Sequence, residues 1–306
     1  MDRRRFLQGL AVGGLTLRYG PRIFAAPQPA STPSPVPAPP GPDLAWMTGE
    51  SPAALTKAAV AALGGMKAFV AKGDKVVVKP NIGWDRTPEM AACTNPEVVR
   101  TLVELVLEAG AKSAIVIDNT TNQAKRCYIR SGIQEAVKQA GGTMLFVDDY
   151  RIKKMPIRGA WLKEWDICLD VVEADKIINV PIAKHHSLTR VTLGMKNWLG
   201  ATGGARNQLH QKLDEAMVDL AAFFKPTLTV LDAYRILVRN GPQGGRLSDT
   251  QLAKTVIAGR DLVAVDAAGA SFFSFTSREL PFLRLAEERG LGKSDLEKLT
   301  IEKRAV

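Results

Sequence analysis

The sequence predicts one α/β domain, in which a mostly parallel sheet is covered by helices on both faces. Short apolar runs rich in β-branched residues alternate with segments of helical periodicity along most of the chain. Parallel strands need crossover connections, which helices supply, so this alternation favours a sheet between two helical layers. The chain of 306 residues is 46% hydrophobic and 24% charged, a composition typical of a globular protein.

The first half of the chain contains three predicted strands and two predicted helices. The strands are residues 75–79, 113–118 and 143–148. After the first strand, Asn95 is placed to cap a helix, Pro96 to occupy its first position and Gly110 to end it. A second helix is predicted over residues 129–141, where two glycines end the pattern.

The second half continues the alternation after an irregular segment. Residues 151–166 are rich in charge and tryptophan without a clear period, and we interpret them as a hairpin or an insertion. Strands are predicted over residues 176–182 and 227–233. Helices are predicted over residues 206–224 and 261–273, because apolar side chains recur there at helical spacing.

The amino terminus has the pattern of an export signal. Residues 1–26 contain Arg3 and Arg4 followed by Phe6 and Leu7, the order of a twin-arginine signal, and then a short apolar stretch. That stretch is far shorter than the roughly 20 residues that span a bilayer, so we expect no stable membrane span. The alternative is an amphipathic basic helix. We therefore expect the protein to bind the twin-arginine export machinery and to be located in the periplasm or in another exported location.

A proline-rich linker and one domain follow the predicted signal. Residues 27–44 hold many prolines, which fix φ and lack an N–H donor, so neither helix nor sheet is expected there. Residues 45–306 are the predicted α/β domain.

Charge and cysteine content limit the classes of partner. The net charge is +10 without long cationic runs, and aromatic residues make up only 6%, so we expect a small-molecule ligand and no nucleic acid. Cys93, Cys127 and Cys168 lie far apart and form no CxxC pair, so no iron–sulfur cluster is expected, and other cofactors stay unknown.

Polar residues follow several predicted strands at the point where each strand ends. Lys79 and Asn81 end the first strand, Asp118 the second, and Lys184 and His186 follow residues 176–182. Asp232 lies near the end of residues 227–233. Because ligands of open α/β sheets collect at the carboxyl ends of the strands, we expect these side chains to converge there.

The chemistry of these residue types suggests roles. The expected catalytic residues are His186, Lys184 and Asp232, since imidazole and carboxylate can exchange protons and lysine can hold negative charge. The expected substrate-binding residues are Lys79, Asn81, Asp118, Lys196, Asn197, His210 and Asp266. The adjacent histidines could instead cap a loop in solvent. A metal bound by histidines and a carboxylate is a further alternative, although no HxH or HExxH spacing supports it.

The motifs together resemble the domain-of-unknown-function family 362. They are VVVKPN, TNPEVV, INVPIAKHHSLTRVTLGMKNWLG, LH, VLDAYRILVRNGPQGG and VIAGRDLVAVDA, and they cover roughly residues 70–275. The resemblance implies an α/β fold and marks shared positions at Lys79, Asn81, Lys184, His186, Lys196, Asn197, Asp232 and Asp266. It implies no settled reaction. Some relatives carry four-cysteine segments that this chain lacks.

Three functions are compatible with these features. The first is an exported enzyme acting on a small anionic or hydroxylated substrate. The second is a noncatalytic protein that binds a ligand or cofactor for a periplasmic redox system. The third is a metal-dependent redox component.

Overall fold

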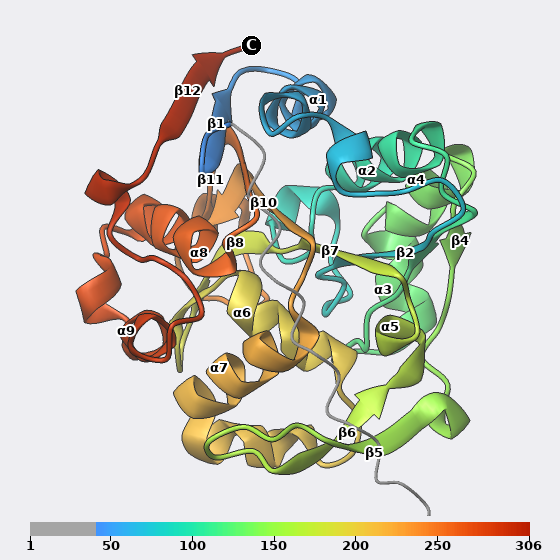
Figure 1. The fold of residues 1–306 in the computed structure, drawn as a ribbon, viewed down its shortest axis with the longest axis vertical. Coiled ribbons are helices and arrows are strands. Elements are labelled where there is room, and N and C mark those ends of the chain that lie inside the picture. Colours follow the sequence, from blue (N-terminus) through green and yellow to red (C-terminus); the bar gives the residue numbers. More distant parts are fainter. Residues whose placement is uncertain (1–40) are drawn as a thin grey trace, which may run out of the picture. The chain divides into compact units, whose positions relative to one another are not determined.

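The computed structural model describes residues 41–306, which form a ten-stranded mixed sheet with helices on both faces (Figure 1). The predicted signal and most of the predicted linker lie outside the described residues. The strands of the sheet are β1 (Leu44–Thr48), β2 (Lys75–Pro80), β3 (Ser113–Val116), β4 (Thr143–Met144), β7 (Lys176–Val180), β8 (Ile182–His186), β9 (Arg190–Thr192), β10 (Leu228–Leu237), β11 (Thr250–Gly259) and β12 (Ile301–Ala305).

The main path of the sheet runs in the order β12-β1-β11-β10-β7-β2-β3-β4, with β8 beside β10 and β9 beside β8. The pairs from β10 through β7, β2 and β3 to β4 are parallel. The strand β11 is antiparallel to both of its neighbours, β10 and β1. The predicted mostly parallel α/β fold is therefore confirmed, with an antiparallel part that the prediction lacked.

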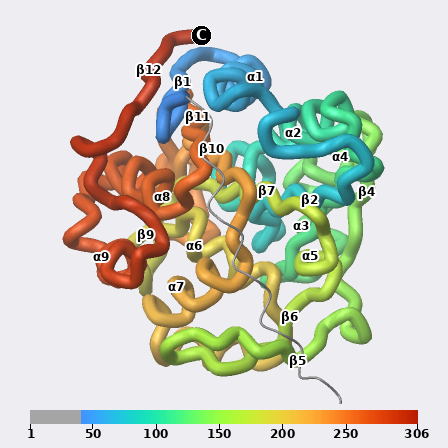
Figure 2. The backbone as a smooth tube through the Cα atoms, in the orientation of Figure 1, coloured from blue at the N-terminus to red at the C-terminus, as the bar shows by residue number. Residues whose placement is uncertain are grey.

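Alternation along the strands assigns side chains to two cores. Val76 and Val78 of β2 belong to one buried cluster, whereas Val77 belongs to the other. Successive strand side chains point to opposite faces, so each face needs its own helical cover. Figures 1 and 2 show this arrangement, with α1, α2 and α4 on one side of the central strands and α7, α8 and α9 on the other. The helices are α1 (Pro52–Ala62), α2 (Pro96–Glu108), α3 (Ala124–Arg130), α4 (Ile133–Gln139), α5 (Leu169–Val172), α6 (Gly194–Asn197), α7 (Leu213–Phe224), α8 (Leu262–Ala270) and α9 (Pro281–Glu288).

Helix α2 begins and ends as the sequence predicts. The Asn95 side chain accepts a hydrogen bond from the backbone N–H of Glu97, and Pro96 is the first helical residue. Gly110 follows the helix with φ of +97°, a conformation that favours glycine. Asn95 and Pro96 therefore fix the start of α2 beside the carboxyl end of β2.

Several boundaries differ from the predictions for identifiable reasons. Residues 129–141 were expected to form one helix, but Gly132, with φ of +74°, separates α3 from α4. Pro181, which has no N–H for a ladder, divides residues 176–182 between β7 and β8. The expected helix over residues 206–224 begins as a 3-10 helix at Arg206–Lys212 and becomes α7 at Leu213.

The irregular segment forms a hairpin, one of the two predicted alternatives. The strands β5 (Ile152–Pro156) and β6 (Glu164–Cys168) pair in antiparallel register and form a separate two-stranded sheet. Strand β4 is shorter than the predicted residues 143–148, because only Thr143 and Met144 pair with β3. None of the helices between residues 41 and 306 combines the length and apolar character that crossing a membrane requires.

Candidate functional site

The loops after the parallel strands enclose a cavity of about 350 Å³. It receives residues from the ends of β2 and β3, from β8, from α6 and from the 3-10 helix Arg206–Lys212. Seven of the predicted site residues line it: Asn81, Asp118, Lys184, His186, Lys196, Asn197 and His210. The predicted residues Lys79, Asp232 and Asp266 do not line it. The rim of the sheet thus gathers most, but not all, of the predicted site.

A buried ion pair lies beneath this cavity. The Lys79 side chain is fully buried, and its ammonium donates to the Pro80 carbonyl at 2.9 Å, to Asp118 Oδ1 at 2.6 Å and to Asn197 Oδ1 at 3.2 Å. The other Asp118 oxygen accepts from the Ile82 N–H at 2.6 Å. All three ammonium hydrogens of Lys79 are therefore used, and both carboxylate oxygens of Asp118 have partners. Lys79 therefore has no ammonium hydrogen left for a ligand, whereas Asp118 lines the cavity as the charge partner of Lys79.

Asn197 is also saturated. Its Nδ2 donates to the Lys79 carbonyl at 3.1 Å and to Asn179 Oδ1 at 2.9 Å. Its Oδ1 accepts from Lys79 and, at 3.2 Å, from Asn81 Nδ2. A primary amide has two donor hydrogens and two acceptor lone pairs, so Asn197 has none left for a substrate. The expectation that Asn197 orients the substrate is not supported by this geometry, and we assign it to holding β2, β7 and α6 together.

Gly200 lets the backbone approach this ion pair. A Cβ at this position would lie 1.8 Å from Asp118 Oδ1 and 2.8 Å from Lys79 Nζ. The Gly200 carbonyl accepts from the Asn119 N–H at 2.7 Å. Any side chain here would displace the Asp118 carboxylate, so the loop after α6 requires glycine.

Asp266 holds the first turn of α6 and lies outside the cavity. Its two carboxylate oxygens accept from the Gly194 N–H at 2.6 Å and the Met195 N–H at 2.8 Å. Burial raises the pKa of Asp266 to about 7. Asp266, which was predicted to bind substrate, lies outside the cavity, and both of its oxygens accept from backbone that precedes Lys196.

Asp232 is likewise separated from the cavity. Its carboxylate accepts from the Asn95 N–H at 2.7 Å and the Tyr234 N–H at 3.0 Å, and burial raises its pKa to about 6. The predicted proton exchange between Asp232 and His186 needs both groups in one site. Asp232 instead fixes the start of α2, next to the loop whose Ala92 carbonyl accepts from Lys184.

Two lysines give the cavity its charge. The Lys184 ammonium donates to Asn81 Oδ1 at 2.9 Å and to the Ala92 carbonyl. Lys196 is only 8% exposed, and its ammonium makes no hydrogen bond or ion pair with any residue from 41 to 306. Burial lowers the pKa of Lys184 to about 8, and burial together with the charge of Lys184 lowers the pKa of Lys196 to about 8. An uncompensated buried cation favours an anion in the cavity.

His186 is held as a neutral hydrogen-bond donor. Its Nδ1 accepts from the backbone N–H of Leu188 at 3.1 Å and of Thr189 at 3.4 Å, which leaves the proton on Nε2. Burial, together with the charges of Lys196 and Lys184, lowers the pKa of His186 to about 3. Such an imidazole is a weak base at neutral pH, so this geometry favours a donor role over the expected general-base role. The adjacent His185 accepts from the Gly241 N–H at 3.1 Å and does not line the cavity.

Sequence reasoning missed Arg206, which lines the same cavity. Its guanidinium donates to the Asn119 carbonyl at 2.7 Å and the Thr120 carbonyl at 2.8 Å, and burial lowers its pKa. His210 lies four residues later at the exposed mouth, and burial and the charge of Lys196 lower its pKa. The available signal was the helix predicted over residues 206–224, because residues four apart share one side of an α-helix.

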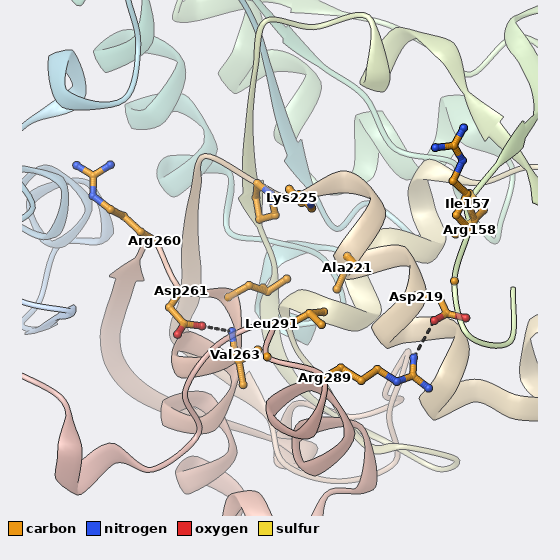
Figure 3. A pocket seen from close by; sticks show the side chains of 15 residues that line it. Ile157, Arg158, Asp219, Ala221, Lys225, Arg260, Asp261, Val263, Arg289 and Leu291 are labelled. Atoms are coloured by element: carbon orange, nitrogen blue, oxygen red, sulfur yellow. Dashed lines mark hydrogen bonds and ion pairs between the residues drawn. The ribbon is translucent and has the colours of Figure 1, made fainter. Parts of the chain in front are cut away.

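A second, larger cavity of about 550 Å³ lacks such convergence (Figure 3). Asp219 is paired there with Arg289 at 2.8 Å, and Asp261 accepts from the Val263 N–H at 2.8 Å. Figure 3 shows the guanidinium groups of Arg158 and Arg260 on opposite sides of the view. The charged groups are thus either paired or spread apart, whereas those of the first cavity gather around one unpaired amine.

Residues 76–271 match the family described as Domain of unknown function (DUF362). The chain belongs to the DUF362 family. A curated relative, the thylakoid-associated protein sll1697 of Synechocystis sp., is 25% identical over 243 residues, which cover 77% of this chain and 74% of the relative. Among solved structures, the lactate racemase apoprotein from Thermoanaerobacterium thermosaccharolyticum is similar with a TM-score of 0.43 and 10% identity. That similarity covers 74% of this chain and 56% of the racemase chain.

The DUF362 match includes the whole candidate site. The cavity residues range from Asn81 to Pro242, all within residues 76–271. Among residues 41–306, no three or more His, Cys, Asp and Glu side chains gather in an arrangement that could hold a metal ion. The three cysteines are buried and free.

Proposed function

We propose that this DUF362 protein is an enzyme that binds a small anionic substrate in the 350 Å³ cavity. The observation that carries the proposal is Lys196, a cation that is 8% exposed and has no partner among the described residues. Leaving a buried charge unpaired costs stability, so such a residue is retained where a ligand completes the pair. A cavity of this size accommodates a small molecule.

The groups around Lys196 define the expected binding mode. Lys184 has one ammonium hydrogen that no residue in the described chain accepts, and Arg206 adds a guanidinium fixed on the Asn119 and Thr120 carbonyls. His186 offers Nε2–H to an uncharged oxygen or to an oxygen that becomes negative during reaction. These groups suit a carboxylate or phosphate next to a polar oxygen.

Export is a separate part of the proposal. It rests on the order of Arg3, Arg4, Phe6 and Leu7 and on the proline-rich residues that follow. The test is the location of the full chain with and without the Arg3→Lys and Arg4→Lys substitutions. Retention of the double variant in the cytoplasm, with export of the parent, is the expected result. Equal location of both proteins would remove export from the proposal.

The binding proposal is tested with the purified full chain and a panel of sulfate, phosphate, acetate, lactate and pyruvate. Calorimetry should detect saturable binding of at least one anion, and Lys196→Met should weaken it at least about tenfold, the expected effect of losing a desolvated charge partner. Lys57→Met is the matched control, because Lys57 is exposed on α1 outside the cavity. Equal loss in both variants, or no binding by the parent, would refute the proposal. Binding without turnover of any panel member would favour the noncatalytic accessory function.

A further inference from the structure

We propose that the Lys196 amine forms an imine with the carbonyl carbon of a small oxo acid, whose carboxylate is held by Arg206 and Lys184. This inference rests on the proposed function and specifies its substrate class and first chemical step. It concerns the one lysine whose amine lies in the cavity without a partner in the described chain.

The surroundings distinguish Lys196 from the other two buried lysines. Lys79 gives all three ammonium hydrogens to oxygen acceptors, one of them a carboxylate. Lys184 gives two to the Asn81 and Ala92 oxygens. Such acceptors stabilise the ammonium form and occupy the nitrogen, which must be neutral to attack a carbonyl. Lys196 donates to no such acceptor, so its nitrogen is the only one of the three that no acceptor in the described chain occupies.

A neighbouring cation adds to this effect. Desolvation and a second positive charge both disfavour the ammonium form, and together they activate a lysine as a nucleophile. The charged and titratable groups that line the cavity with Lys196 are Lys184 and His186 from β8, Arg206 and His210 from the 3-10 helix, and Asp118 after β3. Asp118 is already paired with Lys79. The pKa of Lys196, about 8, agrees with this arrangement of groups.

The step balances without a further reactant. The neutral Lys196 nitrogen forms a bond to the carbonyl carbon, and the C=O π electrons move to oxygen, where His186 Nε2–H can donate a hydrogen bond. The nitrogen then loses one proton, the oxygen takes up that proton and a second one from solvent and leaves as water, and a protonated C=N bond remains. His210, at the exposed mouth, lies where protons can be exchanged with solvent. The substrate carboxylate offsets the positive charge of the protonated imine.

Reductive trapping tests this inference. The full chain is incubated with glyoxylate or pyruvate and cyanoborohydride between pH 6 and 9, and the labelled residue is located by peptide mass spectrometry. We expect one adduct per chain, on Lys196, with labelling that increases up to about pH 8. At pH 7.5 an amine with a pKa of about 8 is more than about a hundredfold richer in the neutral form than one at 10.5, so Lys196 should be labelled far ahead of exposed lysines.

Two variants separate chemistry from charge. Lys196→Arg keeps a cation but cannot form the imine, so labelling should disappear while unreactive lactate or sulfate still binds. Lys184→Met removes one of the two groups that hold the carboxylate, so it should raise the oxo acid concentration needed for half-maximal labelling. At saturating oxo acid it should also move the pH dependence of labelling upward, because removing a like charge raises the pKa of Lys196.

The outcomes are distinguishable from those of the binding proposal. Anion binding that depends on Lys196 with no adduct on it would overturn the imine and leave the anion site. An adduct that persists elsewhere in Lys196→Arg, or equal labelling of exposed lysines, would overturn it as well. Absence of both binding and adduct would overturn both proposals.

Discussion

Two buried lysines should respond to the same substitution with opposite changes in stability. Lys196 has no partner among the described residues, whereas Lys79 is paired with Asp118 at 2.6 Å. Methionine is close to lysine in length and is apolar. The variants Lys196→Met and Lys79→Met therefore compare an unpaired with a paired buried charge within one core.

The size of each effect follows from the surroundings. Burial and the neighbouring charge of Lys184 lower the pKa of Lys196 from 10.5 to about 8, which at 1.36 kcal/mol per pH unit corresponds to a cost of about 3 kcal/mol while the amine is protonated. Lys196→Met removes this cost and should raise the free energy of unfolding by about 1 to 3 kcal/mol at pH 7. Lys79→Met leaves Asp118 buried and unpaired, which should lower it by about 3 to 5 kcal/mol.

Denaturant unfolding at several pH values measures both effects. In the folded protein the lowered pKa of Lys196 makes its cost complete below about pH 8, and the cost diminishes as pH rises toward 10.5. The advantage of Lys196→Met should therefore be largest at pH 7 and smaller at pH 9.5. A Lys196→Met variant that is less stable than the parent at pH 7 would refute the view that this amine is unpaired.

Three further predictions concern the supports of the site and its pH dependence. Gly200→Ala should destabilise the domain by several kcal/mol, because its Cβ would lie 1.8 Å from Asp118 Oδ1; the control Gly245→Ala, with no atom within 4 Å, should be nearly neutral in the same unfolding assay. The affinity for an unreactive anion should fall about tenfold between pH 7 and pH 9 in calorimetry, because Lys196 loses its proton near pH 8; an unchanged affinity would contradict the charge role. Asp232→Asn should lower the free energy of unfolding by about 1 to 3 kcal/mol with little change in anion affinity, since Asp232 binds backbone outside the cavity; a selective loss of affinity would return it to the site.

The sequence predicted the rim of the sheet well because strand ends are a local feature. His186 ends β8, Lys184 lies two residues before it, and Asp118 follows β3. A pattern of apolar runs was therefore enough to predict that these residues lie at one edge. The long antiparallel strand β11 was missed, because its first half contains polar residues that interrupt the apolar pattern. Pairing with β10 stabilises that half, and this pairing between distant segments leaves no signal in the local sequence pattern.

Roles were harder to predict than positions, because they depend on partners distant in sequence. Asp232 and Asp266 were selected as charged residues in apolar segments, but each accepts from a distant backbone N–H group, 137 positions away for Asp232 and 72 positions away for Asp266. Lys79 and Lys196 both lie among apolar residues in the sequence, but of these two only Lys79 has a carboxylate partner, Asp118. A sequence pattern can identify a charged side chain whose burial costs free energy. Coordinates are needed to show whether a hydrogen-bond or charge partner offsets that cost.

The unpaired state of Lys196 follows from how completely its neighbours are satisfied. Asp266 binds the backbone N–H groups of Gly194 and Met195, the two residues that precede Lys196. Asn197, which follows Lys196, uses every donor and acceptor of its side-chain amide. The oxygens around the cavity floor are also taken, those of Asp118 by Lys79 and the Ile82 N–H. The described chain therefore holds Lys196 between fixed neighbours and forms no hydrogen bond to its amine, and the Thr192 hydroxyl in the same cavity has no partner either. An acceptor supplied from outside the chain is the arrangement that completes this site, and an anion is the acceptor that a desolvated ammonium binds most strongly.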